Sequence, residues 1–590
     1  MNTPHTFYTN QRQKYKQASK TVFKQMSVFS LLRLAVFSLT ILGIYLTYQN
    51  WKITLLITAL GIAIFLFLLS RYTDLKSRRA LYKRLVAINE EELEIASGNF
   101  YHRSDGLEFQ NPKHYFSLDI DLFGRGSFFQ YCNRTSIKEG TEKLSKTLLA
   151  NNIEAINSRQ EAIKELADQP KWTQNYSAVA QGIEVDHSAR SIIDWLQDYK
   201  PFLTKSHFVL TILFSIASIA VLTLGIMEII PISIAGYWLL LGLGITGIYL
   251  KKINILADST SKAKDTFRQY ALLLKTIEDS KFQSKLLQEN QKKTMLGDAQ
   301  ASTIFSEFSK ALDALDNRNN LISAILGNGY FLCDLRQAYR IEKWINQYAS
   351  KVGDWFEVVI FFDAYNSLGT YAFNHPNFTY PSIVDEAITI SAEDLGHPLL
   401  NPEKRVDSNL ELDKEQFFIV TGANMAGKST FLRTVALHIV MANIGLPVCA
   451  KSSKYKPIKL ITSMRTSDSL TDDSSYFFSE LTRLKFVVDT IENDKNYFVI
   501  LDEILKGTNS TDKAIGSRKF VEKLVRLNAT GITATHDLSL TEIETQLEAV
   551  KNYYFDAEII NDELHFDYKL KQGVCQNMNA SFLLKKMEIV

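Results

Sequence analysis

A glycine-rich stretch from Gly422 to Thr430 constrains the fold of this chain more than any other segment. It follows the apolar run Phe417–Val420 and precedes Phe431–Leu437, which has helical periodicity. Strand, glycine loop and helix in that order are the context that a phosphate-binding loop requires. The glycines allow a tight turn whose N–H groups point at phosphate oxygens, and the N-terminus of the helix adds positive charge. The stretch therefore predicts an α/β P-loop NTPase domain.

The residues of this loop have expected roles. Lys428 would reach the β and γ phosphates of a nucleotide, and the Ser429 hydroxyl would bind Mg²⁺. An ordinary glycine-rich turn before a helix is the alternative, and it is disfavoured because a second motif lies where a nucleotide site needs one. The expected nucleotide-binding residues are Gly422, Asn424, Met425, Ala426, Gly427, Lys428, Ser429 and Thr430.

An acidic pair at the end of an apolar run is this second motif. Tyr497–Leu501 is apolar without alternation, which is typical of a parallel strand buried on both faces, and Asp502 and Glu503 follow it. Ligands of open α/β sheets bind at the C-terminal ends of the strands. We therefore expect Asp502 to hold Mg²⁺ together with Ser429, and Glu503 to polarise the attacking water.

A third strand is predicted at Gly531–Thr535, and His536 follows it directly. From this position His536 would sense the γ-phosphate. A lone histidine is more often structural, but beside the other two motifs the functional role is favoured. The predicted catalytic residues are Lys428, Glu503 and His536.

Length, charge and cysteine spacing limit the remaining possibilities. At 590 residues the chain is too long for one hydrophobic core and should divide into several domains. The formal net charge is +2, so any contact with nucleic acid would need a local basic patch. The four cysteines are far apart and lack CxxC spacing, which indicates reduced core residues in a cytosolic compartment rather than a metal centre or disulfides.

Four apolar runs are long enough to cross a membrane as helices. They occur as two close pairs, 34–48 with 53–70 and 208–227 with 232–250. Because the connections within the pairs are short, each pair is predicted to form a helical hairpin. Buried core helices are the alternative, but four such runs in two pairs are hard to place in a soluble core.

Basic residues flank the hairpins on the side away from the tips, for example Arg12, Lys24, Arg71 and Arg84. By the positive-inside rule both termini and all large segments should face the cytoplasm. A cleaved signal peptide is a weaker alternative, because the leading region is long and no small-residue cleavage site follows. The sequence thus predicts a multi-pass protein of the cytoplasmic membrane, with the lipid bilayer as a partner. No charged residue within the third or fourth run marks an ion path.

Helical patterns dominate the parts between and after the hairpins. Residues 117–124 resemble a short strand and turn, and amphipathic helices are predicted at 141–149 and 153–166. In the mostly helical stretch 255–370, the charged residues 275–293 indicate a solvated face, with a coiled coil as the alternative. Residues 378–381 open a β-rich passage toward the nucleotide domain.

These patterns divide the chain into six segments. The predicted segments are a cytosolic N-terminal segment at 1–28, a transmembrane hairpin at 29–70, a helical lever region at 71–204, a second transmembrane hairpin at 205–250, a second part of the lever region at 251–375 and an ATPase domain at 376–590.

The motifs together resemble the nucleotide-binding domain of the MutS family of DNA mismatch repair ATPases. The likeness is carried by Gly422–Thr430 with 431–445, Leu501–Ile504, Gly507–Thr511 and Ala534–His536. Upstream, Gly396–Leu400 is similar to the segment that enters the ATPase domain of this family. Residues 121–124 with 158–163 resemble the start of the MutS core lever domain.

The resemblance implies a P-loop NTPase domain of the ABC and MutS type joined to an all-α lever domain, beside the four transmembrane helices. It also implies ATP and Mg²⁺ as cofactors. In this family two ATPase domains face each other, so a homodimer is expected in which each domain completes its partner's site. Residues 474–480 resemble the serine-bearing signature segment, and the spacing to Glu480 identifies Ser475 as the residue presented in trans.

The chain also departs from the family. Residues 1–28 are too short for a mismatch-reading domain, the second hairpin stands where the DNA clamp is inserted, and the helical tail of the family is missing. The preferred hypothesis is a membrane-anchored MutS-like ATPase that couples ATP hydrolysis to lever movement, with DNA, including mismatched DNA, or protein partners as the target.

Two other classes of function stay open. A transporter component is disfavoured because no Leu-Ser-Gly-Gly motif precedes Asp502. A scaffold that uses nucleotide only as a switch is disfavoured because the chain retains both Lys428 and Glu503.

Overall fold

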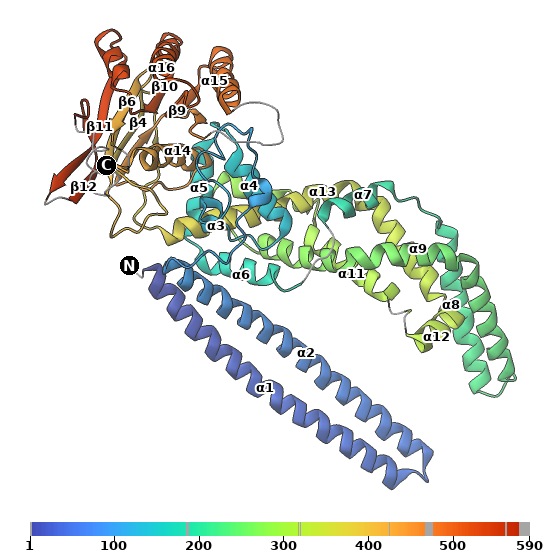
Figure 1. The fold of residues 1–590 in the computed structure, drawn as a ribbon. Coiled ribbons are helices and arrows are strands. Elements are labelled where there is room, and N and C mark those ends of the chain that lie inside the picture. Colours follow the sequence, from blue (N-terminus) through green and yellow to red (C-terminus); the bar gives the residue numbers. More distant parts are fainter. Residues whose placement is uncertain are drawn as a thin grey trace.

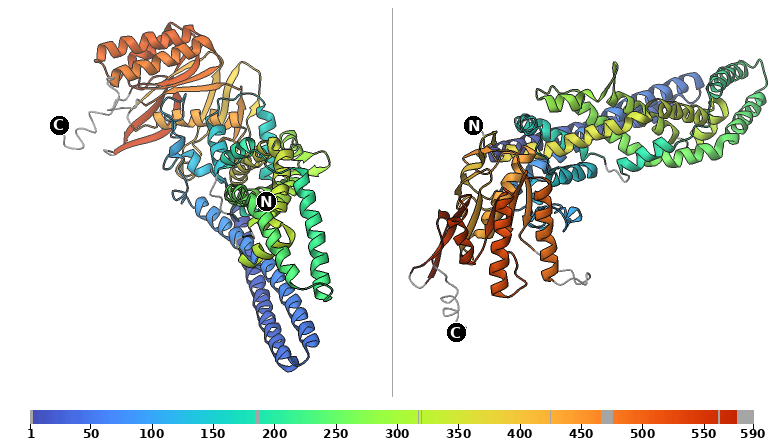
Figure 2. Two further views of the ribbon diagram at one scale, coloured as in Figure 1. Left: turned by 90° about the vertical axis from the view of Figure 1, so that its right-hand side faces the viewer. Right: turned by 90° about the horizontal axis from the view of Figure 1, so that it is seen from above.

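The computed structural model describes residues 3–576 except 184–187, 317, 319, 424, 466–475 and 561–562. Its elements form an α/β domain, a helical lever region and two long helical hairpins (Figure 1). Both hairpins extend away from the α/β domain, and the further views show the same arrangement (Figure 2). The chain is therefore elongated, with its nucleotide-binding motifs at one end and its most apolar helices at the other.

A six-stranded sheet forms the centre of the α/β domain, in the order β12–β11–β6–β10–β9–β8. All neighbours pair in parallel except β11 and β12. The strands are β6 (Phe417–Gly422), β8 (Lys459–Ser463), β9 (Tyr497–Asp502), β10 (Thr530–Ala534), β11 (Val550–Ile560) and β12 (Glu563–Gln572). The helices around this sheet are α14 (Lys428–Ile444), α15 (Tyr476–Asn493), α16 (Ser510–Arg526) and the 3-10 helix η3 (Leu538–Thr545).

Strand β6 is buried on both faces, as its unbroken apolar sequence predicts. Phe418 and Val420 belong to the core that contains α14, whereas Phe417 and Ile419 belong to the core that contains α15 and α16. Successive side chains of a strand point to opposite faces, so the sheet is covered by helices on both sides. This layering places the C-terminal ends of β6, β9 and β10 side by side, which is where the sequence motifs lie.

A second, four-stranded sheet joins the lever region to the nucleotide domain, in the order β3–β7–β4–β5. Its strands are β3 (Ser382–Ile383), β4 (Ile388–Leu395), β5 (Ser408–Asp413) and β7 (Ser452–Tyr455). A bridge between Thr379 and Val448 precedes it. The β-rich passage predicted from residue 378 onward is thus present.

The lever region is built around one long helix, α13 (Cys333–Asn374). The other lever helices are α3 (Phe128–Cys132), α4 (Lys138–Leu149), α5 (Ile156–Ala167), α6 (Pro170–Ala180), α7 (Ala189–Asp198), α10 (Lys285–Lys292) and α11 (Ala301–Asp316). Short elements complete the region: the 3-10 helix η1 (Leu107–Phe109) and the two-stranded hairpin of β1 (Met295–Leu296) and β2 (Ala299–Gln300). Helices α4 and α5 confirm the two amphipathic helices predicted there.

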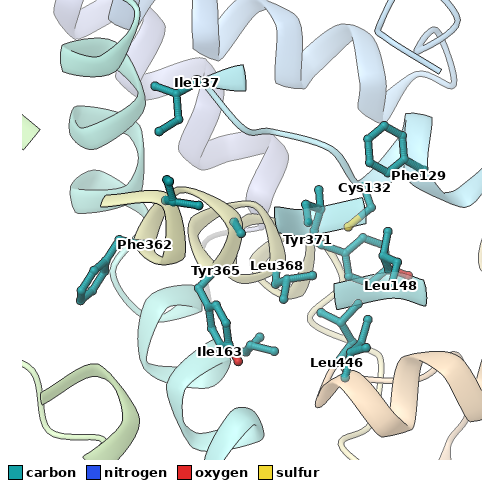
Figure 3. Close-up of a cluster of buried hydrophobic side chains, with 14 of the residues drawn as sticks. Phe129, Cys132, Ile137, Leu148, Ile163, Phe362, Tyr365, Leu368, Tyr371 and Leu446 are labelled. Carbon is teal, nitrogen blue, oxygen red and sulfur yellow. The ribbon is translucent and has the colours of Figure 1, made fainter. Parts of the chain in front are cut away.

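The end of α13 nearest the ATPase domain is deeply buried. Phe362, Tyr365, Leu368 and Tyr371 point from α13 into a cluster of apolar side chains (Figure 3). The cluster is completed by side chains of α3, α4 and α5 and by Leu446, which follows α14. Lever region and ATPase domain therefore share one hydrophobic core at this junction.

The strand predicted at 117–124 is wrong. These residues form successive turns in which Leu122 N–H donates to Ser117 O (3.0 Å) and Asp121 has a φ of 50°. Their apolar side chains are nevertheless buried, Ile120 and Leu122 among them. A short apolar run indicates burial, but it does not distinguish a strand from a buried turn.

Four helices are long and apolar enough to cross a membrane, and they form the two predicted hairpins. They are α1 (Pro4–Thr47), α2 (Trp51–Ala96), α8 (Lys205–Ile226) and α9 (Ser233–Glu278). Helices α1, α2 and α9 continue without a break through the segment limits predicted at residues 28, 70 and 250. At 1.5 Å per residue, α1 and α2 are each about 65 to 70 Å long, roughly twice the thickness of a hydrocarbon core.

The base of the first hairpin is attached to the end of α13. Tyr8 is buried, and its hydroxyl donates to Asn374 Oδ1 (2.6 Å). Asn374 in turn donates to Glu92 of α2 (2.9 Å), and the Glu92 carboxylate pairs with Arg134. Phe7 also packs edge-on against Phe373, with 5.1 Å between the ring centroids. The first hairpin is thus held at the junction between lever and ATPase domain.

A short apolar helix, α12 (Leu321–Phe331), packs against the second hairpin. Its backbone lies so close to α9 that a β-carbon at Gly242 would collide with the Gly329 carbonyl group. By contrast, a β-carbon at Gly244 would have no neighbour within 4 Å. Small residues at a crossing allow two helix backbones to touch, as in many membrane helix pairs.

Replacing Gly242 should therefore destabilise this crossing. We expect Gly242→Leu to cost about 1–3 kcal/mol because the added side chain has to push α12 and α9 apart. Thermal unfolding of the detergent-solubilised protein should show a lower Tm for this variant. The matched control is Gly244→Leu, which should melt like the wild type, and equal melting of both variants would contradict the close contact.

Candidate nucleotide-binding site

The predicted site residues come together at the C-terminal edge of the central sheet. Lys428 and Ser429 begin α14 directly after the glycine loop, Asp502 ends β9, and His536 lies two residues beyond the end of β10. Parallel strands bring these segments together although Lys428 and His536 are 108 residues apart in the chain. The sequence motifs therefore form one site.

The loop before α14 depends on its glycines. Gly422 and Gly427 have φ values of 146° and 104°, which an L-residue rarely adopts. A β-carbon at Gly422 would also lie 2.6 Å from the Phe555 carbonyl oxygen of the neighbouring strand. Ala426 is fully buried beneath the loop, whereas Met425, with a φ of 67°, is exposed. Asn424 lies outside the described residues.

The ammonium group of Lys428 lies inside the loop. Its Nζ donates to the carbonyl oxygens of Gly422 (2.8 Å) and Ala423 (2.9 Å) and lies 3.2 Å from His536 Nε2. Burial lowers the pKa of Lys428, and the carboxylates of Glu503 and Asp502 oppose that shift. The positive charge is thus held by carbonyl dipoles and two nearby acids, which is the environment of a phosphate-binding lysine.

Ser429 and Asp502 form the oxygen pair that Mg²⁺ would require. Ser429 Oγ donates to Asp502 Oδ2 at 2.7 Å. Burial raises the pKa of Asp502, and the hydrogen bond from Ser429 opposes that rise. Mg²⁺ prefers hard oxygen donors and usually takes one or two protein ligands, with phosphate oxygens and water as the others. The two side chains fit this role as predicted.

Glu503 occupies a constrained position just after β9. Its φ is 48°, and its N–H donates to Ala534 O (3.0 Å) of the adjacent strand. Its carboxylate contacts His536 Nε2 at 2.8 Å and Lys506 Nζ at 3.6 Å. The hydrogen bond with His536, followed by the charge of Lys506, lowers the pKa of Glu503 to about 2. The carboxylate is therefore ionised at neutral pH, as a group that polarises water must be.

His536 lies between the two other predicted catalytic residues, within hydrogen-bonding distance of Lys428 Nζ and Glu503 Oε1. The structure thus brings Lys428, Glu503 and His536 together. Sensing of the γ-phosphate by His536 stays a prediction. Ser475, expected to be presented in trans, lies outside the described residues, which resume at Tyr476 with the first turn of α15.

A cavity of about 580 Å³ opens beside these groups, within the usual size range of small-molecule sites. Thr430 and most of the predicted site residues line it. Further residues that were not predicted as site residues also line it, among them His397, Arg405, Phe431, Phe555 and Tyr568. His397 and Phe431 carried a sequence signal, since they lie in the segments 396–400 and 431–445 that resemble the MutS family. Arg405, Phe555 and Tyr568 reach the cavity through tertiary folding from other strands and loops.

The surroundings of His397 favour the neutral form of its imidazole. Burial, followed by the charges of Arg433 and Arg405, lowers the pKa of His397 to about 4. At neutral pH its imidazole is uncharged. Together with Phe431 and Phe555, whose ring centroids are 5.6 Å apart, it lines the cavity that Lys428 also lines.

Comparison with known proteins identifies this domain. Residues 418–586 match the family model described as MutS domain V. This part of the chain is therefore similar to domain V of MutS proteins. The DNA mismatch repair protein MutS of Acetivibrio thermocellus is 32% identical over 209 residues, which are 34% of this chain and 24% of that protein. MutS protein homolog 4 of Homo sapiens is 32% identical over 225 residues, 36% of this chain and 23% of that protein.

The match to MutS proteins is confined to part of each chain. The MutS protein of Halothermothrix orenii is 34% identical over 185 residues, covering 31% of this chain and 20% of its own length. This chain thus spans about a quarter or less of the length of these curated MutS relatives. The family model of MutS domain V covers residues 418–586, which lie within the α/β domain and the residues that follow it.

The Ser429–Asp502 pair of the MutS domain predicts how the site depends on metal. Asp502→Asn should raise the Mg²⁺ concentration needed for tight nucleotide binding by about tenfold or more, because one anionic ligand is lost. The measurement is a titration of a fluorescent ATP analogue at increasing Mg²⁺, with EDTA as the metal-free reference.

Asp489→Asn, on the exposed face of α15, is the matched control. It should titrate like the wild type. If Asp502→Asn kept the wild-type Mg²⁺ requirement, Asp502 would not be a metal ligand.

Proposed function

We propose that this protein is a membrane-anchored ATPase of the MutS type, in which ATP hydrolysis moves the lever helices. The observation that carries the ATPase assignment is the convergence of Lys428, Ser429 and the ionised Glu503 on one cavity, with Asp502 hydrogen-bonded to Ser429. MutS-family proteins provide the precedent for this constellation through the matched domain.

Phosphoryl transfer to water requires positioning and charge neutralisation more than covalent chemistry. Lys428 would exchange the carbonyl oxygens of Gly422 and Ala423 for phosphate oxygens. Glu503 would accept a hydrogen bond from the attacking water, while His536 holds its carboxylate in place. Ser429 and Asp502 would hold Mg²⁺, which would supply additional positive charge at the phosphates.

The proposed active form is a homodimer in which Ser475 completes the partner's site. Support comes from the helix that follows Ser475. Glu480 of α15 is only 4% exposed and accepts a hydrogen bond from Lys506 N–H (3.3 Å) in the loop after Glu503. A movement of the signature segment would therefore reach Lys506, which is three residues from the catalytic Glu503.

Movement of the lever would start from contacts of the P-loop helix. Arg433 on α14 lies 3.5 Å from Asp121, and Asp121 also accepts two hydrogen bonds from Arg465 (2.6 and 2.9 Å). Asp119, in the same turn, accepts from Thr462 (2.5 Å) and from Arg465 N–H (2.9 Å). This turn of the lever region thus contacts α14 on one side and the end of β8 on the other.

Membrane anchoring is proposed for the four apolar helices. In the most apolar 18-residue window of each, at most 22% of the residues are buried within the protein. Unburied apolar helices of this length require a hydrocarbon surrounding. Basic residues at the cytosolic bases of the hairpins support an orientation with the ATPase domain in the cytoplasm. The hairpins also stand apart in Figure 1, which favours anchoring over a transport path between them.

Replacing Glu503 tests the ATPase assignment. Glu503→Gln keeps the shape of the side chain but removes the charge that polarises water, so we expect ATP to be bound and hydrolysis to fall by about a hundredfold or more. Retained radiolabelled ATP and steady-state phosphate release would measure the two effects. Lys428→Ala should instead lose nucleotide binding itself, and a Glu503→Gln variant with wild-type turnover would refute the proposed role.

DNA is the second candidate target, because the relatives from Acetivibrio thermocellus and Halothermothrix orenii are DNA mismatch repair proteins. The same phosphate-release assay, repeated with homoduplex, mismatched and branched DNA, distinguishes DNA from protein partners as the target of the levers. We expect no response to any of them, since the family model that the chain matches covers only domain V, at residues 418–586. Stimulation of phosphate release by DNA would instead indicate that the levers act on DNA.

Fractionation tests the membrane anchor. We expect the full chain to stay in the membrane pellet after extraction with alkaline carbonate, because two hairpins bury four apolar helices in lipid. Protease added to inside-out vesicles should remove the ATPase domain, whereas sealed right-side-out vesicles should protect it. Release of the chain by carbonate would contradict the proposed spans.

A further inference from the structure

The second hairpin carries an apolar element that none of the predicted spans contains. Helix α12 has no charged residue and exposes four large apolar side chains. These are Leu321 (72% exposed), Ile322 (71%), Ile325 (40%) and Leu326 (48%). At positions i, i+1, i+4 and i+5 they form one face of the helix.

We infer that α12 is a fifth membrane-inserted element, whose exposed face contacts lipid acyl chains beside the α8–α9 hairpin. This inference rests on the proposed membrane anchoring. Eleven residues rise about 16 Å, half of a hydrocarbon core, so α12 enters one leaflet and does not span the bilayer.

The contacts of α12 place it at the depth of the membrane. Gly329 touches α9 at Gly242, which lies near the middle of the apolar run 232–250. The Tyr330 hydroxyl donates to Ala235 O (3.2 Å), closer to the tip of the hairpin. Ser215, in the apolar part of α8, donates to Phe331 O (3.4 Å). Three contacts with both helices thus fix α12 alongside the proposed spans.

The polar groups around α12 are paired inside the protein. Asn328 is buried and accepts a hydrogen bond from Asp334 N–H (2.9 Å) at the start of α13. The Asp334 carboxylate pairs with Arg318 (3.4 Å), and both side chains are largely buried. Internal pairing of polar groups is what a lipid surrounding requires. An exposed apolar face with satisfied polar ends suits lipid better than water.

The apolar surface of α12 continues that of the hairpin. Helix α8 exposes Leu213, Ile216 and Ile219 along its own outer face. Because α12 packs against both α8 and α9, the two exposed faces belong to one end of the molecule (Figure 1). The lipid acyl chains that surround the hairpin therefore also cover the exposed face of α12.

Photo-crosslinking in vesicles tests the inference. The full chain, carrying benzoylphenylalanine in place of Ile322 or of Leu326, is reconstituted into vesicles of phosphatidylethanolamine and phosphatidylglycerol and irradiated. We expect lipid adducts by mass spectrometry at a yield within about twofold of Ile216, which marks the middle of the α8 span. Lys285, exposed on α10 in the lever region, is the negative control and should give no lipid adduct.

The outcomes separate this inference from the proposed anchoring. Adducts at Ile216 without adducts at Ile322 and Leu326 would overturn the role of α12 and leave the four spans intact. Protein–protein adducts at Ile322 or Leu326 would show a second protein on this face and also overturn it. Absence of lipid adducts at Ile216 as well would refute the membrane anchor together with the inference.

Discussion

The structure depends on the burial of one continuous helix, α13. At 1.5 Å per residue it is about 63 Å long, and it crosses the whole lever region. At one end Phe208 of α8 stacks on Tyr339, with 4.9 Å between the ring centroids. At the other end Tyr365 and Tyr371 enter the core shared with the ATPase domain. A helix that is packed along its length bends little, so it links the second hairpin to the nucleotide site as a rod.

The joint between rod and nucleotide site is electrostatic as well as apolar, and its contacts differ in strength. Asp121 and Arg465 are both almost half exposed, so their ion pair contributes about 0–1 kcal/mol. Asp119 is only 4% exposed, and hydrogen bonds to a buried charged group are worth about 1.5–3 kcal/mol each. Asp119 therefore holds the turn in place, whereas the Asp121 contacts can rearrange at small cost when Arg433 and α14 respond to nucleotide.

The sequence predicted which residues meet at the candidate nucleotide site, because each of its motifs is encoded locally. The glycine loop, the run before Asp502 and the strand before His536 each combine a short motif with a strand buried on both faces, and such strands have unbroken apolar sequences. Residues 117–124 have a similar apolar pattern but fold as turns, because the buried Asp119 is tied to Thr462 and Arg465 far along the chain. No local pattern shows such a partner.

Two other features could not be predicted from the sequence, because they also depend on contacts between residues that are far apart in the chain. Helix α12 is too short for a membrane span, and its significance depends on the contact of Gly329 with Gly242, 87 residues away in the sequence. Tyr568 and Phe555 line the nucleotide cavity only because β11 pairs with β6 and with β12. Helices α1, α2 and α9 extend beyond their apolar runs because polar residues such as lysine and glutamate also favour helix.

The placement of the two hairpins constrains what a nucleotide-driven movement can do. The first hairpin is fixed at the ATPase end of α13 through Tyr8 and Asn374, and the second is fixed at the far end through Phe208 and Tyr339. If both tips are held in one bilayer, any rotation of the ATPase domain relative to α13 must either bend the cytosolic half of the first hairpin or change the separation of the two hairpins in the membrane. The interhelical packing of α1 and α2 resists bending along their length. The proposed movement would therefore be directed into the plane of the membrane, and the bilayer and the hairpins would be the first structures on which the proposed ATPase acts.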